Sequence, residues 1–278
     1  MNNENPKILS HLQALTNQVK RIAVEAGELI YGHYDESGFS DVIEKNDGSP
    51  VTIADQEGEK FIIEKLKGIT GDIPIVGEEM VEAGEVISLD DSEYYWLVDA
   101  LDGTKGFIKG DGDFTVNIAL IRNGKPVLGV IYAPHHEELY AGFEGGIATR
   151  WLEESKNEKE IRTRSMPKDG LTIMTSYNRS AEKRDQFLES FMVKKIVRRY
   201  SSIKICSIAQ GKADLYPCLG QTCFWDTAAG DAILRSAGSG IVDLDGNLLE
   251  YTPNKNNPKY FNKEFLALSQ DLKLAMFP

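Results

Sequence analysis

The sequence predicts a protein of mixed structure, with an α+β first half and an α/β second half. Apolar residues recur at helical spacing through residues 7–34, which predicts one long amphipathic helix. Alternating strand patterns flank Asn123-Gly124, a dipeptide typical of a tight β-hairpin turn. After residue 170, short strand patterns alternate with helical ones. These features predict helices on an antiparallel sheet, followed by an alternating α/β unit.

The first half is expected to contain a second helix and an antiparallel meander. This helix covers about residues 53–66, and Thr52 is its expected cap. A polar stretch, residues 44–50, separates the two helices. Strands are expected at residues 73–76, 94–98, 114–121, 127–132 and 139–143.

A change in composition predicts a domain boundary. Residues 152–169, which follow Gly145-Gly146, are polar and charged, so we expect domains at 1–152 and 153–278. In the second domain we expect strands at 171–175, 195–199 and 213–216, helices at 181–191, 202–209 and 227–237, and a final hairpin turning at Asp245-Gly246.

Charge narrows the range of partners. Lys and Arg total 31 against 43 Asp and Glu, so the net charge is −12. A chain this acidic is expected to repel nucleic acid, because its basic clusters at 194–195 and 198–199 are short. A small anionic substrate would need a local positive charge to bind, such as a metal ion or a few Lys and Arg side chains in the site.

The cysteine and histidine patterns do not indicate a zinc site. The three cysteines include no CxxC pair, and the four histidines are not arranged around them. We expect buried, reduced thiols. His135 and His136 are interpreted as a solvated turn in preference to metal ligands.

Two aspartates directly follow a strand that should be buried. Asp99 and Asp102 come after the apolar residues 94–98, and any tight turn brings their carboxylates close together. Like charges in a desolvated setting are costly, and a bound Mg²⁺ or Mn²⁺ relieves the cost. Gly103 and Thr104 then open a short helical stretch whose amides suit a phosphate. An Asx turn with a helix cap is the alternative interpretation.

Three further carboxylates stand at the ends of predicted elements. Glu78 follows the strand at 73–76, Asp55 opens the helix at 53–66, and Asp226 opens the helix at 227–237. A plain helix cap is the alternative for Asp226. Together with Asp99 and Asp102, these positions predict a shared multi-metal centre.

Such a centre indicates metal-assisted hydrolysis of a phosphate ester. No Ser, Cys or His stands in a recognisable phosphoenzyme setting, so we expect direct in-line attack by a metal-activated water. Thr104 is the candidate for orienting that water, and Asp55 for accepting the Thr104 hydroxyl proton. Glu78 is the candidate metal ligand that helps to take the proton from the water.

These motifs resemble a known family in order and spacing. The residues are Glu78-Glu79, the run from Asp99 to Thr104, and Trp225-Asp226-Thr227-Ala228. They are similar to the inositol monophosphatase-like superfamily of Mg²⁺-dependent, Li⁺-sensitive phosphatases. The match is closer to its bacterial 3'(2'),5'-bisphosphate nucleotidase branch, which is known for a role in sulfur assimilation. Further similar stretches are residues 46–52, 102–109, 112–120, 124–134, 201–204 and 251–253.

The resemblance implies a fold and a set of metal ligands. The fold is a layered α-β-α-β-α sandwich. One Mg²⁺ would be bound by Glu78, Asp99 and the carbonyl of Leu101, and a second by Asp99, Asp102 and Asp226. A third, weaker ion would lie near Glu78, so two to three ions are implied.

The resemblance also implies a reaction and a substrate site. Adenosine 3',5'-bisphosphate would be converted to AMP and phosphate, with Thr104 and Asp55 positioning the water. Lys204 could pair with a second phosphate, and a surface lysine is the alternative interpretation. The implied substrate-binding residues are Asp102, Gly103, Thr104, Ser201, Ser202, Lys204 and Asp226.

Three positions depart from the family pattern. Ala100 replaces the usual Pro, Gly106 replaces the Glu usual in the nucleotidase branch, and Tyr200 replaces the usual Gly. Tyr200 lies on the substrate side, where it would either stack on a base or narrow the pocket.

Two other functions are weighed against the nucleotidase. An inositol or broader sugar monophosphatase on the same fold is the first alternative. A metal- or phosphate-binding module without turnover is the remote one, because such a module has no use for a water-orienting pair. The expected partner is a small phosphate ester, without nucleic acid, and the chain is expected to be a monomer or a homodimer. No signal peptide or transmembrane segment is expected, which predicts a cytoplasmic location, with peripheral attachment to the inner membrane as the variant.

Overall fold

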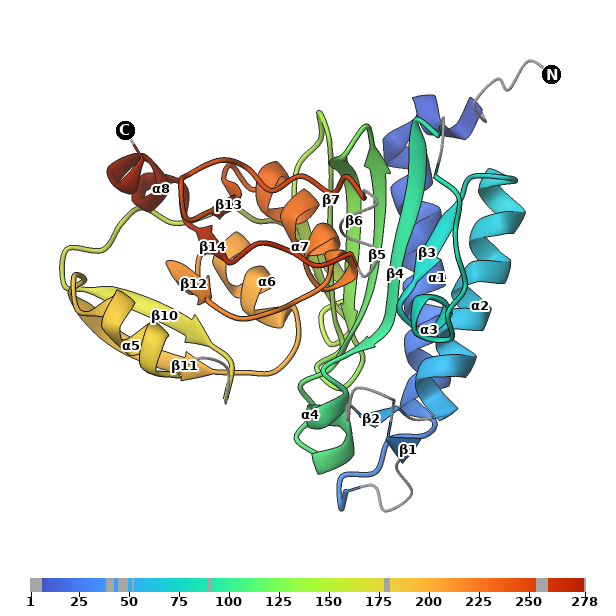
Figure 1. Cartoon of the computed structure of the whole chain (residues 1–278), viewed down its shortest axis with the longest axis horizontal. Coiled ribbons are helices and arrows are strands. Elements are labelled where there is room, and N and C mark those ends of the chain that lie inside the picture. The colour runs from blue at the N-terminus through green and yellow to red at the C-terminus, as the bar shows by residue number, and fades with distance from the viewer. Residues whose placement is uncertain are drawn as a thin grey trace.

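The protein is a five-layered sandwich, seen from the edge of its sheets in Figure 1. The computed structural model describes residues 7–38, 43–44, 50–51, 53–89, 92–177, 181–253 and 260–277. From one side to the other, the layers are two helices, a seven-stranded sheet, two helices, a five-stranded sheet and two short helices. This arrangement confirms the predicted α-β-α-β-α sandwich. Thr52 and most of residues 46–52 lie outside the described residues.

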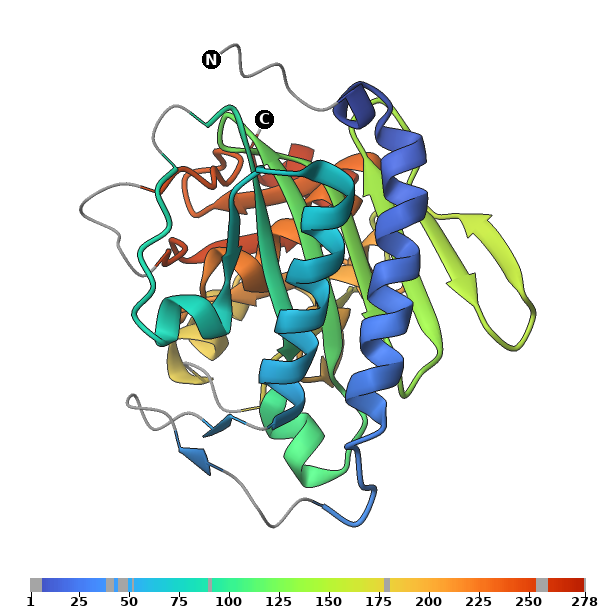
Figure 2. The same cartoon turned by 90° about the vertical axis from the view of Figure 1, so that its right-hand side faces the viewer.

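The outer helical layer consists of α1 (Leu12–Tyr31) and α2 (Ile53–Thr70), which lie side by side on one face of the larger sheet (Figure 2). The predicted single helix over 7–34 is wrong in its first turn. A 3-10 helix, η1 (Lys7–Ser10), precedes α1, and His11 between them has a non-helical backbone. Helix α2 runs past the predicted residue 66, because its end is set by Gly71, whose positive φ of 64° lets its amide bond to Lys67 O.

The larger sheet has the strand order β3-β4-β5-β6-β7-β8-β9. The β3–β4 pair is parallel, and every other pair is antiparallel, so the predicted antiparallel meander is confirmed for the strands after β4. Asn123 and Gly124 both have positive φ, as the predicted hairpin turn requires. The strands are β3 (Ile75–Gly77), β4 (Tyr94–Asp102), β5 (Thr115–Arg122), β6 (Lys125–Ala133), β7 (Glu138–Phe143), β8 (Thr149–Leu152) and β9 (Asn157–Glu160).

Strands β8 and β9 form a hairpin that the sequence did not predict. It projects from the sheet in Figure 2 and occupies the start of the polar segment assigned to the domain boundary. All four residues of β9 are exposed, so no alternation of apolar and polar residues marks this strand. The division at residue 152 remains a prediction. A separate two-stranded sheet, β1 (Ile43–Glu44) and β2 (Pro50–Val51), lies between α1 and α2 in the chain.

The middle layer is formed by α6 (Ile203–Ala209) and α7 (Phe224–Ser236). Helix α7 approaches the larger sheet closely because glycines face it. A Cβ at Gly129 would lie 2.2 Å from the carbonyl oxygen of Ala229, and one at Gly142 would lie 2.8 Å from Cα of Ile233. Helix α7 begins at Phe224 and not at the predicted residue 227, so Asp226 stands inside its first turn.

The smaller sheet has the strand order β11-β10-β12-β14-β13. Strand β10 is parallel to both of its neighbours, and β14 is antiparallel to both of its own, so only part of this sheet follows the predicted α/β pattern. The expected turn at Asp245-Gly246 exists, but β13 pairs mainly with β14. The elements are β10 (Leu171–Thr175), β11 (Val193–Arg198), β12 (Leu215–Cys218), β13 (Gly240–Asp243), β14 (Phe265–Leu268), α5 (Ala181–Leu188) and α8 (Gln270–Met276).

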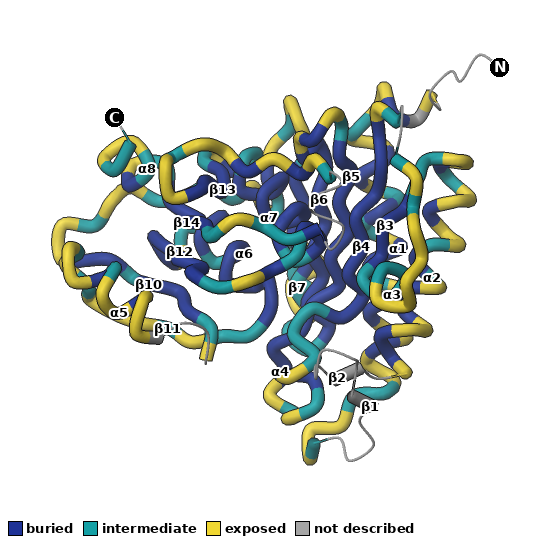
Figure 3. The backbone as a smooth tube through the Cα atoms, viewed as in Figure 1, coloured by how far each residue is buried: buried dark blue, intermediate teal, exposed yellow. Residues whose placement is uncertain are grey.

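Three apolar cores hold the layers together. One lies between α1, α2 and the larger sheet, a second surrounds α6 and α7 between the sheets, and a third lies under α5 and α8. In Figure 3 the buried residues follow the strands and the middle helices, while exposed residues follow the outer surfaces. Because the second core contains residues of both sheets, it fixes their relative positions, and the candidate site lies at its edge.

Candidate metal and phosphate site

Asp99 and Asp102 stand in the last part of β4, which extends beyond the predicted end at residue 98. The register of β4 against β5 shifts between them, since Asp99 pairs with Asn117 and Asp102 with Thr115. This bulge places two residues opposite one and bends the strand end. The amide of Leu101 donates a hydrogen bond to Asp99 Oδ1 over 3.0 Å, which fixes the orientation of that carboxylate.

Glu78 begins α3 (Glu78–Glu82) at the end of β3. The buried carboxylate of Glu59, from α2, accepts hydrogen bonds from the amides of Glu79 (2.8 Å) and Met80 (2.9 Å). These amides belong to the first turn of α3, where a negative charge is favourable. Glu59 therefore fixes the helix that carries Glu78.

Asp226 reaches the same place from α7. Its Oδ2 accepts a hydrogen bond from the backbone amide of Cys223 over 2.7 Å, in a reciprocal capping arrangement. The cap interpretation of Asp226 is thus correct for one oxygen. It does not exclude a second role, because a carboxylate has two acceptor oxygens.

Glu78, Asp99 and Asp226 form a carboxylate cluster. Each offers one ligand atom, and these atoms lie within 4.8 Å of one another. Asp99 is only 2% exposed, and its Oδ2 has no hydrogen-bond partner. Burial, followed by the charges of Glu78, Asp102, Asp226 and Asp55, raises the pKa of Asp99 well above its usual value. An unpartnered buried oxygen among like charges fits a hard divalent cation such as Mg²⁺.

Asp102 accepts hydrogen bonds from both halves of the chain. Its Oδ2 accepts a hydrogen bond from the amide of Ser202 (2.5 Å) and another from Asn117 Nδ2 (3.4 Å). Ser202 precedes α6, and its hydroxyl donates to Asn117 Oδ1 over 2.8 Å. These bonds link the end of β4 to the segment that leads into α6, so both halves of the chain shape the site.

Thr104 and Asp55 are in contact, as their predicted partnership requires. Thr104 Oγ1 lies 3.4 Å from Asp55 Oδ1 and 3.2 Å from the carbonyl oxygen of Leu101. Thr104 opens α4 (Thr104–Lys109), and Gly103 before it has a φ of 95°. A Cβ at Gly103 would lie 2.6 Å from Asp113 O and 3.0 Å from Ser201 Cβ, so only glycine fits there.

These residues open into a cavity of about 330 Å³ between the two sheets. Ser201, Ser202 and Lys204 line it together with the carboxylate cluster. Lys204 is 4% exposed, so its interpretation as a surface lysine is wrong. Its Nζ donates to the carbonyl oxygen of Ser201 and lies 5.1 Å from the centre of the Tyr216 ring. The cavity thus combines negative charge at one end with a buried cation in its wall.

Tyr200 forms an aromatic wall of the cavity. Its ring stacks on that of Tyr177, with 4.6 Å between centroids, and its hydroxyl accepts a hydrogen bond from Lys109 over 2.9 Å. That hydrogen bond is the main cause of the raised pKa of Lys109.

The cysteines and histidines take no part in the cluster found among the described residues. Cys206 and Cys218 are buried and Cys223 is half-buried, and all three are free thiols, so the expectation of buried thiols is wrong for Cys223 alone. His136 hydrogen-bonds to Asp113 over 3.1 Å and is only part-buried. In the described part of the chain, no helix is long and apolar enough to cross a membrane.

Comparison with known proteins identifies the family. The sequence profile of the inositol monophosphatase family matches residues 11–274. The chain belongs to this family. A 3'(2'),5'-bisphosphate nucleotidase CysQ of Escherichia coli is 41% identical over 248 residues, which covers 88% of this chain and 98% of that protein. The CysQ of Buchnera aphidicola is 37% identical over 254 residues, covering 91% and 93%.

Solved structures of two bacterial proteins share the fold, and one of them is described as a member of the inositol monophosphatase family. The crystal structure of CysQ from Bacteroides thetaiotaomicron superposes with a TM-score of 0.75 at 30% identity, covering 93% of this chain and 98% of that one. SuhB from Bartonella henselae superposes with the same TM-score of 0.75 at 26% identity, covering 95% and 96%.

Sequence reasoning missed three residues that shape this candidate site. Glu59 supports Glu78, while Lys109 and Tyr177 complete the wall around Tyr200. Glu59 carried a usable signal, because it is an acidic residue one turn after Asp55 on the same predicted helix. Tyr177 carried none, since it lies in a loop far in sequence from Tyr200.

Proposed function

We propose that the chain is a Mg²⁺-dependent phosphomonoesterase that hydrolyses the 3'-phosphate of adenosine 3',5'-bisphosphate to give AMP and phosphate. The carboxylate cluster with the unpartnered Oδ2 of Asp99 carries this proposal, because it is a cation site at the end of a substrate-sized cavity. The nucleotidases that are about 40% identical to this chain support the choice of substrate.

The proposed ion sites follow the carboxylates and one carbonyl. Glu78, Asp99 and the carbonyl of Leu101 would hold one Mg²⁺, and Asp99, Asp102 and Asp226 a second, with a third near Glu78. When bound, the ions would neutralise the cluster, polarise a water and stabilise the leaving oxygen.

Thr104 would orient the attacking water. A hydroxyl has one proton and two lone pairs. If Thr104 donates its proton to Asp55, 3.4 Å away, its lone pairs remain free to accept a proton of the water. Asp55 is buried, and the carbonyl oxygen of Leu101, 3.2 Å from Thr104 Oγ1, is the competing acceptor for that proton. Glu78, beside the cluster, would help to take the proton that the water loses.

The rest of the cavity would hold the nucleotide. The amides of Gly103 and Thr104 would bind the phosphate that is cleaved, and Ser201 and Ser202 would line its path. Lys204 would attract the second phosphate, and the Tyr177–Tyr200 stack would offer an aromatic face to the base. An inositol monophosphate has neither a second phosphate nor a base, so these features favour the nucleotide over the alternative substrate.

The test is Mg²⁺-dependent phosphate release from adenosine 3',5'-bisphosphate and inositol 1-phosphate, measured side by side. We expect a strong preference for the nucleotide, inhibition by Li⁺, and loss of activity in Asp102→Asn. Asp169→Asn, which changes an exposed carboxylate paired with Lys194, serves as the matched control and should retain activity. Preference for inositol 1-phosphate would contradict the proposed substrate, and release from neither would contradict the proposed reaction.

The role of Thr104 has its own test. Thr104→Ala should lower kcat by about 10²-fold or more, the usual effect of losing a group that positions the nucleophile. Mg²⁺ affinity, measured by calorimetry, should change little, because the hydroxyl is not a proposed ligand. Unchanged turnover would exclude the role.

A further inference from the structure

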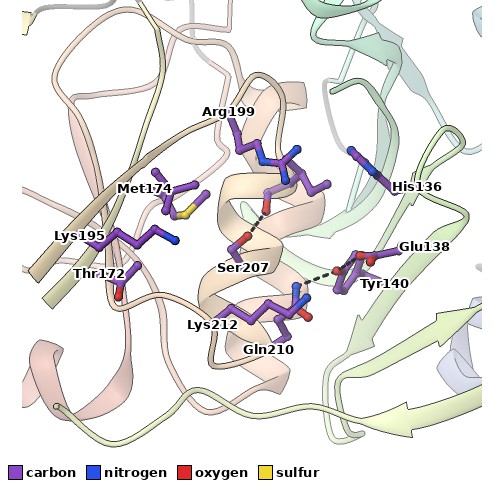
Figure 4. Close-up of a pocket in the computed structure, with 12 residues that line it drawn as sticks. His136, Glu138, Tyr140, Thr172, Met174, Lys195, Arg199, Ser207, Gln210 and Lys212 are labelled. Carbon is purple, nitrogen blue, oxygen red and sulfur yellow. Dashed lines mark hydrogen bonds between the residues drawn. The ribbon is translucent and has the colours of Figure 1, made fainter. Parts of the chain in front are cut away.

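A second cavity of about 390 Å³ lies on the other side of α6 (Figure 4). Strands β7 and β11, helix α6 and the residues that follow it contribute its walls. Ile203 lines this cavity, and the next residue, Lys204, lines the cavity described above. Among the described residues, the two cavities have no lining residue in common.

Three cations gather around this cavity in a chain of net charge −12. Lys195 and Arg199 come from β11 and the residue after it, at alternate positions, so both face the cavity while Lys194 and Arg198 face away. Lys212 enters from the segment after α6. Figure 4 shows Lys195 and Lys212 extending into the space from different sides.

The carboxylates near this cavity are already engaged. Glu138, which lines it, forms an ion pair with Arg150 and accepts a hydrogen bond from Tyr140. Asp113 pairs with Arg199 over 2.6 Å. Among the described residues, no ion pair is found for Lys195 or Lys212.

The surroundings of Lys212 are positive. Burial and the charge of Arg150 lower its pKa, and Arg199 acts in the same direction. Only Glu138 opposes them. Lys195 and Lys212 are exposed and Arg199 is half-buried, so the three cations share a solvent-accessible space. A bound anion would offset the repulsion that lowers the pKa of Lys212.

We propose that this cavity is a second binding site, for a small anion that carries a phosphate or sulfate group, held by Lys195, Arg199 and Lys212. Its volume falls within the range of small-ligand pockets. Met174 and Val197 supply apolar wall beside the cations, so the site could take an organic group as well as the anionic one. The argument uses no residue of the carboxylate cluster and does not rest on the proposed reaction.

The test measures lysine acetylation rates by mass spectrometry in the full-length, Mg²⁺-loaded protein at constant ionic strength. Inorganic sulfate, inorganic phosphate and AMP are the three probes. At a probe concentration of about ten times the dissociation constant, labelling of Lys195 and Lys212 should slow by about tenfold. Lys194, on the same strand but paired with Asp169, is the internal control and should not respond. Lys109 reports separately on occupancy of the first cavity.

A variant pair makes the test specific. In Lys195→Gln, the concentration needed to protect Lys212 should rise by about tenfold, because one charged contact is lost. In Lys194→Gln it should stay the same. Stronger protection by AMP than by the inorganic ions would assign the site to organic phosphates, and equal protection would assign it to the free ion. Absence of protection, equal slowing of Lys194, or unchanged protection of Lys212 in Lys195→Gln would overturn the proposal.

Discussion

Replacing Asp99 by Asn should stabilise the metal-free protein and abolish its response to Mg²⁺. Asp99 lies within 4.8 Å of ligand atoms of both Glu78 and Asp226, a separation at which two like charges repel by about 3.5 kcal/mol at an effective dielectric constant of about 20. Asn keeps an oxygen for the Leu101 amide and offers its own NH₂ to the neighbouring carboxylates. The substitution therefore removes two repulsions without leaving a polar group unpartnered.

The observed gain will be smaller than the sum of the two repulsions. Glu78 and Asp226 are only half-buried, so solvent screens part of the interaction, and protonation of Asp99 relieves more of it. We expect about 2 kcal/mol, which corresponds to a rise in Tm of about 3–4 °C for a chain of this size. Wild type should regain that difference when Mg²⁺ is added, because a cation that binds only the folded state stabilises it.

The assay is thermal unfolding of wild type, Asp99→Asn and the control Asp169→Asn, with EDTA and with saturating Mg²⁺. Wild type should be the less stable protein in EDTA and should gain stability with Mg²⁺, whereas Asp99→Asn should barely respond. Asp169→Asn should follow wild type in both conditions, because an exposed ion pair contributes about 0–1 kcal/mol. The reasoning is refuted if Asp99→Asn is less stable than wild type in EDTA, or if Mg²⁺ raises both Tm values equally.

Three further predictions concern residues around the cluster. Glu59→Gln should lower the free energy of unfolding by about 2 kcal/mol, because two amides lose a charged acceptor, and urea unfolding measures this. It should also raise the Mg²⁺ concentration for half-maximal activity, which a Mg²⁺ titration measures. Burial opposes ionisation of Asp113, but hydrogen bonds and charges from His136 and Arg199 lower its pKa below the usual 3.8. The free energy of unfolding should therefore decrease as the pH falls below about 4, because the folded state must then protonate this carboxylate. In Asp113→Asn, the free energy of unfolding, measured between about pH 5 and 2, should decrease less steeply. Tyr200→Gly should lower kcat/KM for adenosine 3',5'-bisphosphate by about tenfold, the effect of losing one stacked ring, while that for inositol 1-phosphate does not fall; equal losses on both substrates would contradict a role for Tyr200 in base recognition.

The sequence predicted most of the fold because its elements have clear periodicity. The helix patterns of α1 and α2 and the hairpin at Asn123-Gly124 depend on local spacing, which needs no tertiary contact. Strand β9 was not predicted, because neither of its faces is buried and its sequence therefore shows no alternation. The start of α7 was predicted three residues late. Asp226 caps the helix from inside its first turn, by accepting a hydrogen bond from the amide of Cys223, and the sequence alone does not distinguish this arrangement from one in which Asp226 precedes the helix.

The candidate carboxylates could be predicted because a carboxylate at the end of a buried strand is costly unless a cation or a hydrogen-bond donor compensates its charge. Glu78, Asp99 and Asp226 come together as expected, although they are far apart in the chain. The spacing of Glu59 from Asp55 marked it as a residue on the same helix face, but its supporting role could not be assigned, because that role depends on the distance between α2 and the first turn of α3. That distance is set by packing: a Cβ at Gly77 would lie 2.4 Å from the Glu59 carboxyl carbon.

The departures at positions 106 and 200 show most clearly what sequence reasoning lacks. In the sequence they are two separate departures from the family pattern, Gly106 in place of Glu and Tyr200 in place of Gly. In the structure they share one space, because a Cβ at Gly106 would lie 3.1 Å from Cδ2 of Tyr200 and 2.7 Å from both Asp111 Oδ1 and Asp113 O. A side chain at 106 would therefore meet the backbone carbonyl of Asp113 first, and the ring of Tyr200 adds a second, weaker restriction. The two positions are thus neighbours in space, and Tyr200 supplies an aromatic surface of the cavity next to Lys109 and Tyr177.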